Sequence, residues 1–419
     1  MRHRLRAVIA GSLVVAVACV GGCSGAGARP AEPKVQRASA ESTAVVYPVA
    51  VTSTEGTAPA LTYKEYQVPG WGDFEGYGER FATIKYTPRA EGQPTTLSIL
   101  DFTTAKWARI VDSAVNFEDG FDILGVSSND HWVAWEEVKG DEQAEPFEVL
   151  WKLYAAKIDA GSMKLGKPVL VDESEVSMHS RPLLQVDGDL VYWMTNSTPN
   201  RRQEGVVDGA LVESRDLVSG VTTVVCETTA HWRTMSVQQG KVIVDEMGRT
   251  SERALLRVID PATAQNAWSL DLRNTARLSH FPQVHDGALA WTVYTSDTLT
   301  YPDLFYRGTD GVTRAVRRGT SNPQHVGRYV FYTGIHVVPN GVGMRKNLTM
   351  LGGYDTETNT TFTIIEGDPE DGAWWRLPMV SPYSEDTFVV SNDLAPFADS
   401  PEAAAKAPLC IRRYTVATN

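Results

Sequence analysis

The residues of this chain best suited to chemistry recur in short segments that place a histidine or an aromatic residue near a proline or an arginine. These segments are His179-Ser180-Arg181-Pro182, His231-Trp232-Arg233, His280-Phe281-Pro282, Asn322-Pro323-Gln324-His325 and Trp374-Trp375-Arg376. Imidazole, guanidinium and indole groups brought together suit an anionic or sugar-like ligand. The predicted binding face comprises His179, Arg181, His231, Arg233, His280, His325, Trp374, Trp375 and Arg376.

Two other interpretations fit the same residues. A repeating protein can reuse one packing solution, in which case the histidines and tryptophans only cap its core. A metal held by His179, His231 and His280 would need a spacing that resembles no zinc signature, so we predict no metal.

Catalytic signatures do not decide the function. The sequence contains no Gly-x-Ser-x-Gly, His-Glu-x-x-His, phosphate-binding glycine loop or EF-hand pattern, so we assign no catalytic residue and no cofactor. A hydrolase or lyase could still use Asp73, Glu75 or Asp122 with His179 or His280 on a sugar-like or anionic substrate. A binding or scaffold module needs fewer assumptions and is the preferred prediction.

The elements that must position these residues repeat along the chain. An apolar strand followed by Asp-x-x-Ser or Asp-x-x-Thr recurs every 40 to 60 residues or so, with its aspartate at Asp101, Asp159, Asp216, Asp260 and Asp355. Degenerate copies begin at Asp310 and Thr415. An aspartate that accepts backbone N–H groups one or two residues on makes a hairpin turn, so these carboxylates are predicted to be structural.

A second marker alternates with the first. Strands rich in β-branched and aromatic residues follow a turn near residues 81, 132, 190, 241, 288, 329 and 388. Seven copies of each marker predict an all-β fold, a seven-bladed β-propeller with four antiparallel strands per blade. The last copy ends near Asn419, so an N-terminal strand is expected to close the ring: residues 44–51 or 60–66 would pair with residues 409–415.

With these repeating markers, the sequence resembles the TolB-like and quinoprotein-like propeller repeats, which are WD40-like, over about residues 65 to 419. The segment from Val258 to Trp268, with Asp260 and Thr263, carries the resemblance to the quinoprotein repeat. The adjacent cysteine pair of quinone-dependent alcohol dehydrogenases is missing, which argues against a quinone. The resemblance implies a fold and no particular activity.

In such a ring the marked turns share one face, and the other face carries the long polar segments at residues 87–94, 139–146, 196–209, 295–302, 333–346 and 392–408. Long loops on a rigid scaffold often carry function. We therefore expect this loop-rich face to bind an envelope protein, a peptide or a glycan, although surface insertions without function would look the same.

The N-terminus predicts export. Arg2, Arg4 and Arg6 precede an apolar run that is too short to span a bilayer comfortably, and Val20-Gly21-Gly22-Cys23 resembles the lipobox of bacterial lipoproteins. The predicted parts are a signal peptide (1–22), a flexible tether that could supply the closing strand (23–59) and the propeller (60–419). Lipid on Cys23 would hold the protein at the extracytoplasmic side of the cell membrane.

The net charge restricts the possible binding partners, and the cysteine content restricts the possible disulfides. Loss of the three signal-peptide arginines would take the net charge from −12 to −15, which argues against binding to nucleic acid or to an anionic membrane surface. Cys226 and Cys410 would be the cysteines of the propeller, and the sequence leaves their pairing open. The propeller is expected to be a monomer.

Overall fold

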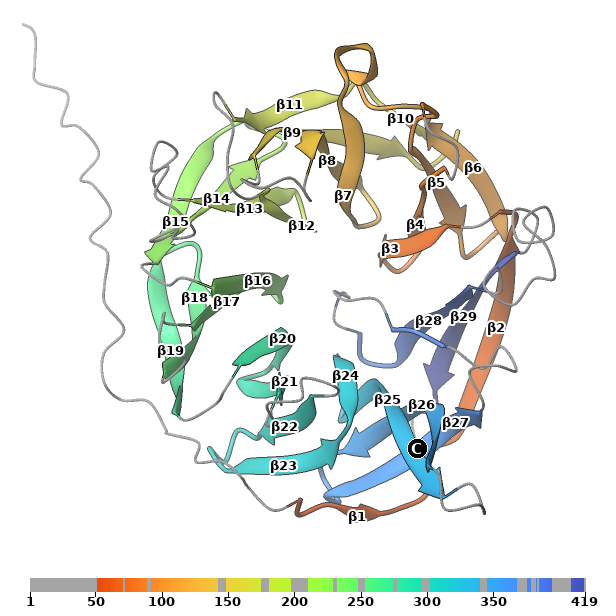
Figure 1. Ribbon diagram of the computed structural model, residues 1–419, viewed down its shortest axis with the longest axis vertical. Helices are drawn as coiled ribbons and strands as arrows, with labels where there is room; N and C mark the ends of the chain where they lie inside the picture. Colours follow the sequence, from red (N-terminus) through yellow and green to blue (C-terminus); the bar gives the residue numbers. More distant parts are fainter. Residues whose placement is uncertain are drawn as a thin grey trace, which may run out of the picture. The chain divides into compact units, whose positions relative to one another are not determined.

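The computed structural model describes residues 51–70, 72–88, 92–141, 148–174, 181–196, 210–228, 232–247, 253–273, 277–294, 302–339, 345–367, 375–377, 382, 384–393 and 408–417. Contacts divide the chain into Met1–Lys34 and Val35–Asn419, and all described residues belong to the second unit. Its strands form seven antiparallel sheets around a common axis, which makes it a seven-bladed β-propeller (Figure 1). The predicted fold class is confirmed.

Blades 1 to 3 run outward in chain order. Blade 1 contains β3 (Asp73–Tyr77), β4 (Phe81–Tyr86), β5 (Thr96–Asp101) and β6 (Lys106–Val111). Blade 2 contains β7 (Asp122–Ser128), β8 (Trp132–Asp141) and β9 (Glu148–Asp159), with β10 (Lys164–Leu165) and β11 (Val169–Glu173) both paired to β9. Blade 3 contains β12 (Leu183–Asp187), β13 (Leu190–Asn196), β14 (Ala210–Asp216) and β15 (Thr222–Thr228). A 3-10 turn, η1 (Phe117–Asp119), precedes β7.

Blades 4 to 6 repeat this order. Blade 4 contains β16 (Trp232–Gln238), β17 (Lys241–Met247), β18 (Arg253–Asp260) and β19 (Gln265–Arg273). Blade 5 contains β20 (Arg277–His285), β21 (Ala288–Tyr294), β22 (Asp303–Arg307) and β23 (Thr313–Arg318). Blade 6 contains β24 (Thr320–Val326), β25 (Tyr329–Pro339), β26 (Arg345–Asp355) and β27 (Thr360–Gly367), with β1 (Thr54–Glu55) added outside β27.

Blade 7 joins the two ends of the described chain. It contains β28 (Thr387–Asp393), β29 (Leu409–Val416) and, as its outermost strand, β2 (Leu61–Val68). β2 is antiparallel to β29 from the pair Leu61–Val416 to the pair Val68–Leu409, and a bridge joins Arg376 to Ser391 on the inner side of β28. Of the two predicted closing segments, residues 60–66 therefore close the ring, while residues 44–50 lie outside the described part of the chain.

The segment before β2 follows the outer edge of the ring. Thr52 N–H donates to the Ala315 carbonyl of blade 5 at 3.1 Å, and Ser53 Oγ donates to the Val316 carbonyl at 2.5 Å. β1 then pairs in parallel with β27 of blade 6. Residues 51–68 thus connect the outer strands of blades 5, 6 and 7 (Figure 1).

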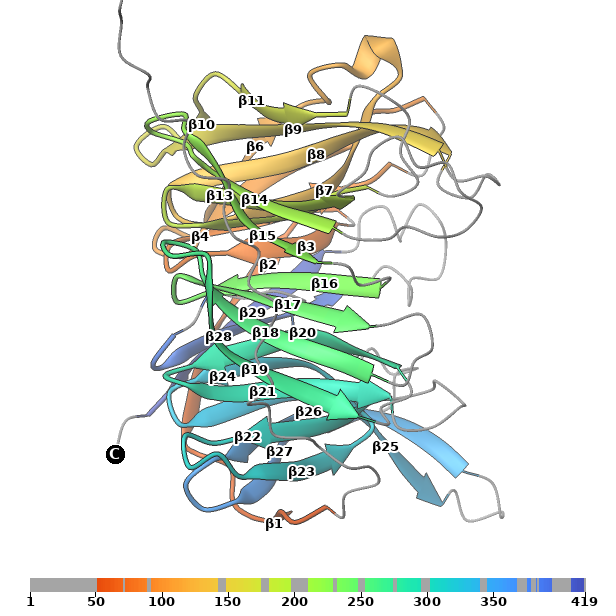
Figure 2. The same ribbon diagram turned by 90° about the vertical axis from the view of Figure 1, so that its left-hand side faces the viewer.

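The predicted aspartate turns connect the third and fourth strands of their blades. In blade 3, Asp216 Oδ1 accepts N–H groups of Val218 and Ser219, both at 2.8 Å. Asp159 accepts the Gly161 N–H at 3.0 Å and the Ser162 hydroxyl at 2.6 Å. These turns share one end of the ring, here called the hairpin face, and the innermost strands begin at the opposite end, the loop face (Figure 2).

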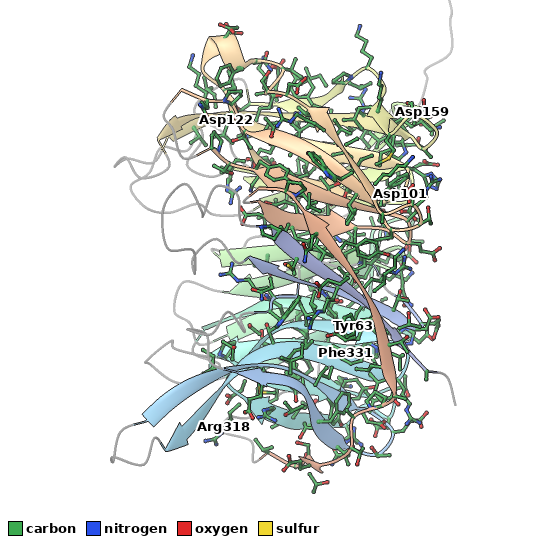
Figure 3. All side chains as sticks on the ribbon, turned by 90° about the vertical axis from the view of Figure 1, so that its right-hand side faces the viewer. Tyr63, Asp101, Asp122, Asp159, Arg318 and Phe331 are labelled. Atoms are coloured by element: carbon green, nitrogen blue, oxygen red, sulfur yellow. The ribbon has the colours of Figure 1, made fainter. Side chains whose placement is uncertain are left out.

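Labelled side chains mark the two faces. Asp101 and Asp159 lie at the hairpin face, whereas Asp122 and Arg318 lie toward the loop face (Figure 3). The long polar segments predicted for the loop face fall largely outside the described residues.

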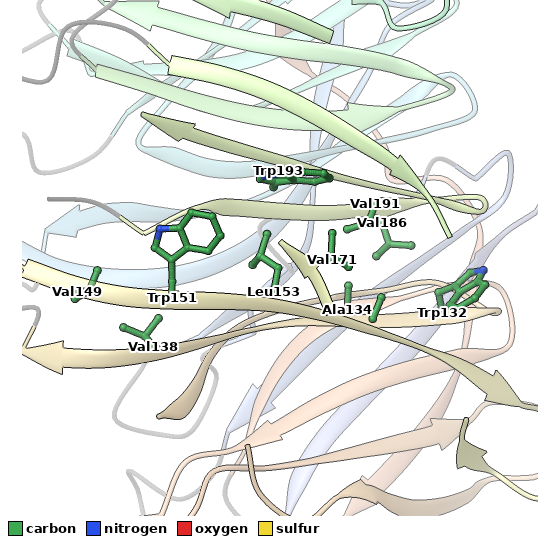
Figure 4. Packing of buried hydrophobic residues seen from close by; sticks show 11 residues of the cluster. Trp132, Ala134, Val138, Val149, Trp151, Leu153, Val171, Val186, Val191 and Trp193 are labelled. Carbon is green, nitrogen blue, oxygen red and sulfur yellow. The ribbon is translucent and has the colours of Figure 1, made fainter. Parts of the chain in front are cut away.

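The core lies between neighbouring sheets, because each strand alternates its side chains between the two sides of its blade. Trp132 of β8, Trp151 of β9 and Trp193 of β13 fill the space between blades 2 and 3 (Figure 4). Trp193 is 1% exposed, and its indole N–H donates to Asp172 Oδ2 at 2.9 Å. The aromatic strands that the sequence marks as repeats are therefore the second strands of the blades and carry the packing.

The two propeller cysteines do not form a disulfide. Cys226 in β15 and Cys410 in β29 are buried free thiols in blades 3 and 7. Burial raises the pKa of Cys410, which favours the protonated thiol. Among the described residues, no helix is long and apolar enough to cross a bilayer.

Candidate functional site

The ring encloses a cavity of about 740 Å³. Its wall is formed mainly by the innermost strands of blades 1 to 4, with contributions from blades 6 and 7. Residues from both ends of these strands line it, such as Asp73 and Arg181 near the loop face and Asp187 and Gln239 near the hairpin face. The volume falls within the usual range for sites that bind small molecules.

Side chains of the innermost strands hold the cavity wall together. Ser127 of β7 accepts the Val186 N–H of the next blade at 2.9 Å. Gln185 of β12 both accepts the Val237 N–H and donates to the Val237 carbonyl, each at 2.7 Å. Because each bond crosses from one blade to the next, the wall is a fixed frame rather than a set of independent strands.

The first charged pair of the wall belongs to blade 1. Lys85 Nζ in β4 lies 2.5 Å from Glu75 Oε1 in β3, and the same ammonium donates to the Leu124 carbonyl of blade 2 at 2.9 Å. Burial raises the pKa of Glu75, nearby Asp73 raises it further, and Lys85 counteracts both only in part. Glu75 is therefore a carboxyl group that gains or holds a proton more readily than an exposed glutamate.

The second charged pair joins blades 2 and 3. Glu136 Oε2 in β8 lies 3.3 Å from Arg181 Nη1, just before β12, and the Glu136 side chain is 1% exposed against 40% for Arg181. A Cβ atom at Gly125 would come within 2.8 Å of Glu136 Oε2, so glycine at this position leaves room for the carboxylate. Both charged pairs lie in the loop-face half of the cavity.

The hairpin-face half carries uncharged polar groups beside the carboxylate Asp187. Ser128 of β7 and Gln238 of β16 line the cavity and are 8% and 3% exposed. Gln238 Oε1 accepts the Val284 N–H of blade 5 at 2.8 Å. Within the described part of the chain, Ser128 Oγ and Gln238 Nε2 have no hydrogen-bond partner.

The predicted binding residues are found in three different settings. Arg181 and Arg376 line the cavity. Trp375 packs against the core between blades 6 and 7, with the Arg412 guanidinium 4.1 Å from its ring centroid. His325 is 4% exposed and is not among the residues that line the cavity.

Two more of the predicted residues lie on innermost strands. Arg233 and His280 belong to the innermost strands β16 and β20, although the structure describes only their backbone. His179, His231 and Trp374 lie outside the described residues. Among the described residues, no group of three or more His, Cys, Asp or Glu side chains could hold a metal ion.

His325 packs within the ring instead. Its imidazole lies between His285 at 4.8 Å and Tyr306 at 6.1 Å, measured between ring centroids. Burial, helped by the neighbouring His285, lowers the pKa of His325 to about 3, so the ring is neutral at ordinary pH. A neutral buried imidazole of this kind acts as packing.

The carboxylates considered for catalysis also lie in different settings. Asp73 and Glu75 line the cavity, whereas Asp122 accepts the N–H and the hydroxyl of Thr95 at 3.0 and 2.8 Å and is not among the lining residues. Asp122 therefore fixes the end of the segment that leads into β5.

Sequence reasoning missed Glu136 and Lys85. A signal for Glu136 was present, because Glu136 and Glu137 follow Trp132-Val133-Ala134-Trp135 in a strand that otherwise reads as fully buried. Acidic side chains in such a strand need partners. Glu137 finds its partners in the backbone of Val115 and Asn116, and Glu136 finds one in Arg181.

Solved structures with a similar chain path are β-propeller proteins. A prolyl endopeptidase aligns with a TM-score of 0.51 at 11% identity, over 82% of this chain and 49% of that chain. An acylaminoacyl peptidase from Pyrococcus horikoshii aligns with a TM-score of 0.49 at 8% identity, over 84% and 52%. The propeller domain of the trilobed protease from Pyrococcus furiosus gives 0.43 at 11% identity, over 65% and 77%.

The likeness is one of fold. This chain spans about half the length of the two full peptidases above. No family model and no curated protein sequence matches it.

Proposed function

We propose that this protein is a lipoprotein whose β-propeller binds an envelope protein, a peptide or a glycan at the loop face of its ring, on the extracytoplasmic side of a bacterial membrane. The observation that carries the proposal is the cavity of about 740 Å³, whose loop-face half contains the pairs Glu75–Lys85 and Glu136–Arg181. A ring that served only as a spacer would gain more stability from apolar side chains at these positions.

The location follows from the N-terminal sequence. The basic start, the short apolar run and Val20-Gly21-Gly22-Cys23 support export and lipid attachment at Cys23. Replacement of Cys23 by Ser should move the folded protein from the membrane fraction to the soluble fraction. Retention of the C23S protein in the membrane would contradict the lipid anchor.

Site-specific cross-linking tests the binding face. A photo-cross-linking amino acid at Leu183, which lines the cavity and is 36% exposed, should give a discrete product in cell envelopes. The same group at Val218, a hairpin-face residue that is 72% exposed, is the matched control and should not give that product. Arg181→Glu should abolish the Leu183 product, and its persistence would argue against binding in the cavity.

A second candidate function has one observation in its favour. Glu75 lines the cavity, and burial raises its pKa, which is a property of carboxylic acids that act as proton donors. The alternative is a hydrolase or lyase that acts on a sugar-like or anionic substrate in the cavity. Slow product formation from a bound saccharide that disappears in Glu75→Gln, with binding retained, would favour the enzyme over the binding module.

A further inference from the structure

Three features of the cavity wall together narrow the chemistry of its ligand: balanced charges, two buried polar atoms without partners and an aromatic side chain. We infer that the cavity binds a neutral saccharide of at least two rings, an inference that rests on the proposed binding function and specifies its ligand.

The charges of the wall nearly cancel. The lining includes the carboxylates Asp73, Glu75, Glu136 and Asp187 and the cations Lys85, Arg181 and Arg376. Glu75 and Lys85 lie 2.5 Å apart, so a strongly charged ligand would have to compete with a charge already in place. A hydroxyl group donates one hydrogen bond and accepts others, so a polyhydroxylated ligand can bind a carboxylate and an ammonium group without separating them.

Two polar atoms without hydrogen-bond partners also favour a polyhydroxylated ligand. Ser128 Oγ and Gln238 Nε2 lack a partner within the described part of the chain, although both side chains are more than nine-tenths buried. A buried polar group without a partner costs free energy that a ligand recovers when it supplies the missing hydrogen bond. Ser128 can donate or accept, and Gln238 can donate to a hydroxyl oxygen.

The positions of these groups set the length of the ligand. The charged pairs lie toward the loop face, whereas Ser128 and Gln238 lie near the hairpin-face ends of β7 and β16. A ligand that reaches both sets must extend along the axis of the ring. Phe74 of β3 also lines the cavity and is only partly buried, so it offers an apolar surface for the C–H face of a sugar ring.

Titration calorimetry on the full chain tests this inference with four neutral disaccharides: maltose, cellobiose, trehalose and N,N′-diacetylchitobiose. Spermidine, citrate and triglycine are the cationic, anionic and peptide comparison probes. At least one disaccharide should bind saturably with one site per chain, and more tightly than any comparison probe.

Two pairs of variants locate the binding. Ser128→Ala removes a hydroxyl that has no partner in the described structure, so the fold should be kept while disaccharide affinity falls about 3- to 10-fold. Ser98→Ala is its matched control, because Ser98 Oγ is equally buried and unpartnered there but does not line the cavity. Gln238→Met removes the unpartnered Nε2 donor together with the Oε1 acceptor of the Val284 N–H, and Gln283→Met is its comparison variant outside the cavity lining.

The possible outcomes separate the two proposals. If no disaccharide binds, or if Ser98→Ala weakens binding as much as Ser128→Ala, the saccharide inference is wrong. If only triglycine or a charged probe binds, and Ser128→Ala weakens that binding, the cavity is a ligand site for another class and the proposed function stands. Failure of the Leu183 cross-link together with saccharide binding would instead exclude the envelope protein and the peptide as ligands and keep the glycan.

Discussion

Glu136 of blade 2 and Arg181 of blade 3 form an ion pair across a blade boundary, with Oε2 and Nη1 3.3 Å apart. Arg181→Met should lower the free energy of unfolding by about 1–3 kcal/mol, because it leaves a carboxylate that is 1% exposed without this cation, although water screens the 40% exposed arginine. Urea denaturation followed by tryptophan fluorescence measures the change. The exposed pair Arg109–Asp112 provides the control, and Arg109→Met should change stability by less than about 0.5 kcal/mol.

The buried His325 should make the fold sensitive to acid. Burial and the neighbouring His285 lower the pKa of His325 to about 3 in the folded protein. In the unfolded chain the same side chain takes up a proton near pH 6.5, which the folded protein does not bind at that pH. The corresponding stability is complete above pH 6.5 and is lost as the pH falls from there toward 3, with a loss of about 2 kcal/mol at pH 5. Urea denaturation at pH 7.5 and pH 5 should show that His325→Leu has a weaker pH dependence than the parent.

The exposed His131 is the control for this effect. His131→Gln removes a histidine whose side chain is exposed, so it serves as the comparison variant in the same two urea series. Equal pH dependence in the parent and His325→Leu would show that His325 does not govern acid sensitivity.

The strand that closes the ring can be locked covalently. Gln67 of β2 is directly opposite Cys410 of β29, a free thiol. Gln67→Cys should form a disulfide under oxidising conditions and stabilise the protein by about 2–4 kcal/mol, because the bond closes a very long loop. A gel shift after thiol labelling measures the bond, and Gln67→Ser is the control. A fully labelled, reduced Gln67→Cys protein would contradict the register of this pair.

Two copies of the same turn should differ in their importance. Asp101 is 1% exposed and accepts hydrogen bonds from Arg80 at 2.8 Å and from the Thr103 hydroxyl at 2.5 Å. Burial alone would raise the pKa of Asp101, but these bonds hold it well below its usual range. Asp101→Ala should therefore cost about 1.5–3 kcal/mol, and Asp159→Ala in its exposed turn should cost less in the same denaturation assay. Equal losses would show that the shared turn, not the contact of the buried Asp101 with Arg80, determines the loss of stability.

Much of the fold could be predicted from the sequence because a repeated blade repeats its signals. Asp216 marks the turn between β14 and β15, and Trp193 marks a buried second strand, so the same two markers predicted all seven blades. The sequence offered two segments that could close the ring. Only the pairing of Leu61–Val68 with β29 in the structure shows which of them does so.

The candidate site was harder to predict, because it depends on contacts between blades. Arg181 was chosen for its residue type, whereas its partner Glu136 is distant in sequence and is brought close only by the packing of blade 3 on blade 2. His325 looked equivalent to the other histidines, yet its place in β24 turns it toward His285 and Tyr306 and away from the cavity lining. The sequence pattern of a strand predicts how its side chains are spaced along that strand. Which side chains of neighbouring blades come into contact depends on how the sheets are staggered.

The pairing of Leu61–Val68 with Leu409–Val416 also determines the order in which this protein can complete its folding. The last sheet cannot assemble until nearly the whole chain has been synthesised, and contacts of such long sequence separation form slowly because loop closure must come first. Until then β2 has no partner strand, and an unpaired strand edge is the kind of surface through which chains aggregate. Blade 7 is thus the last step of folding and the stage at which a newly made molecule is most exposed to misassembly.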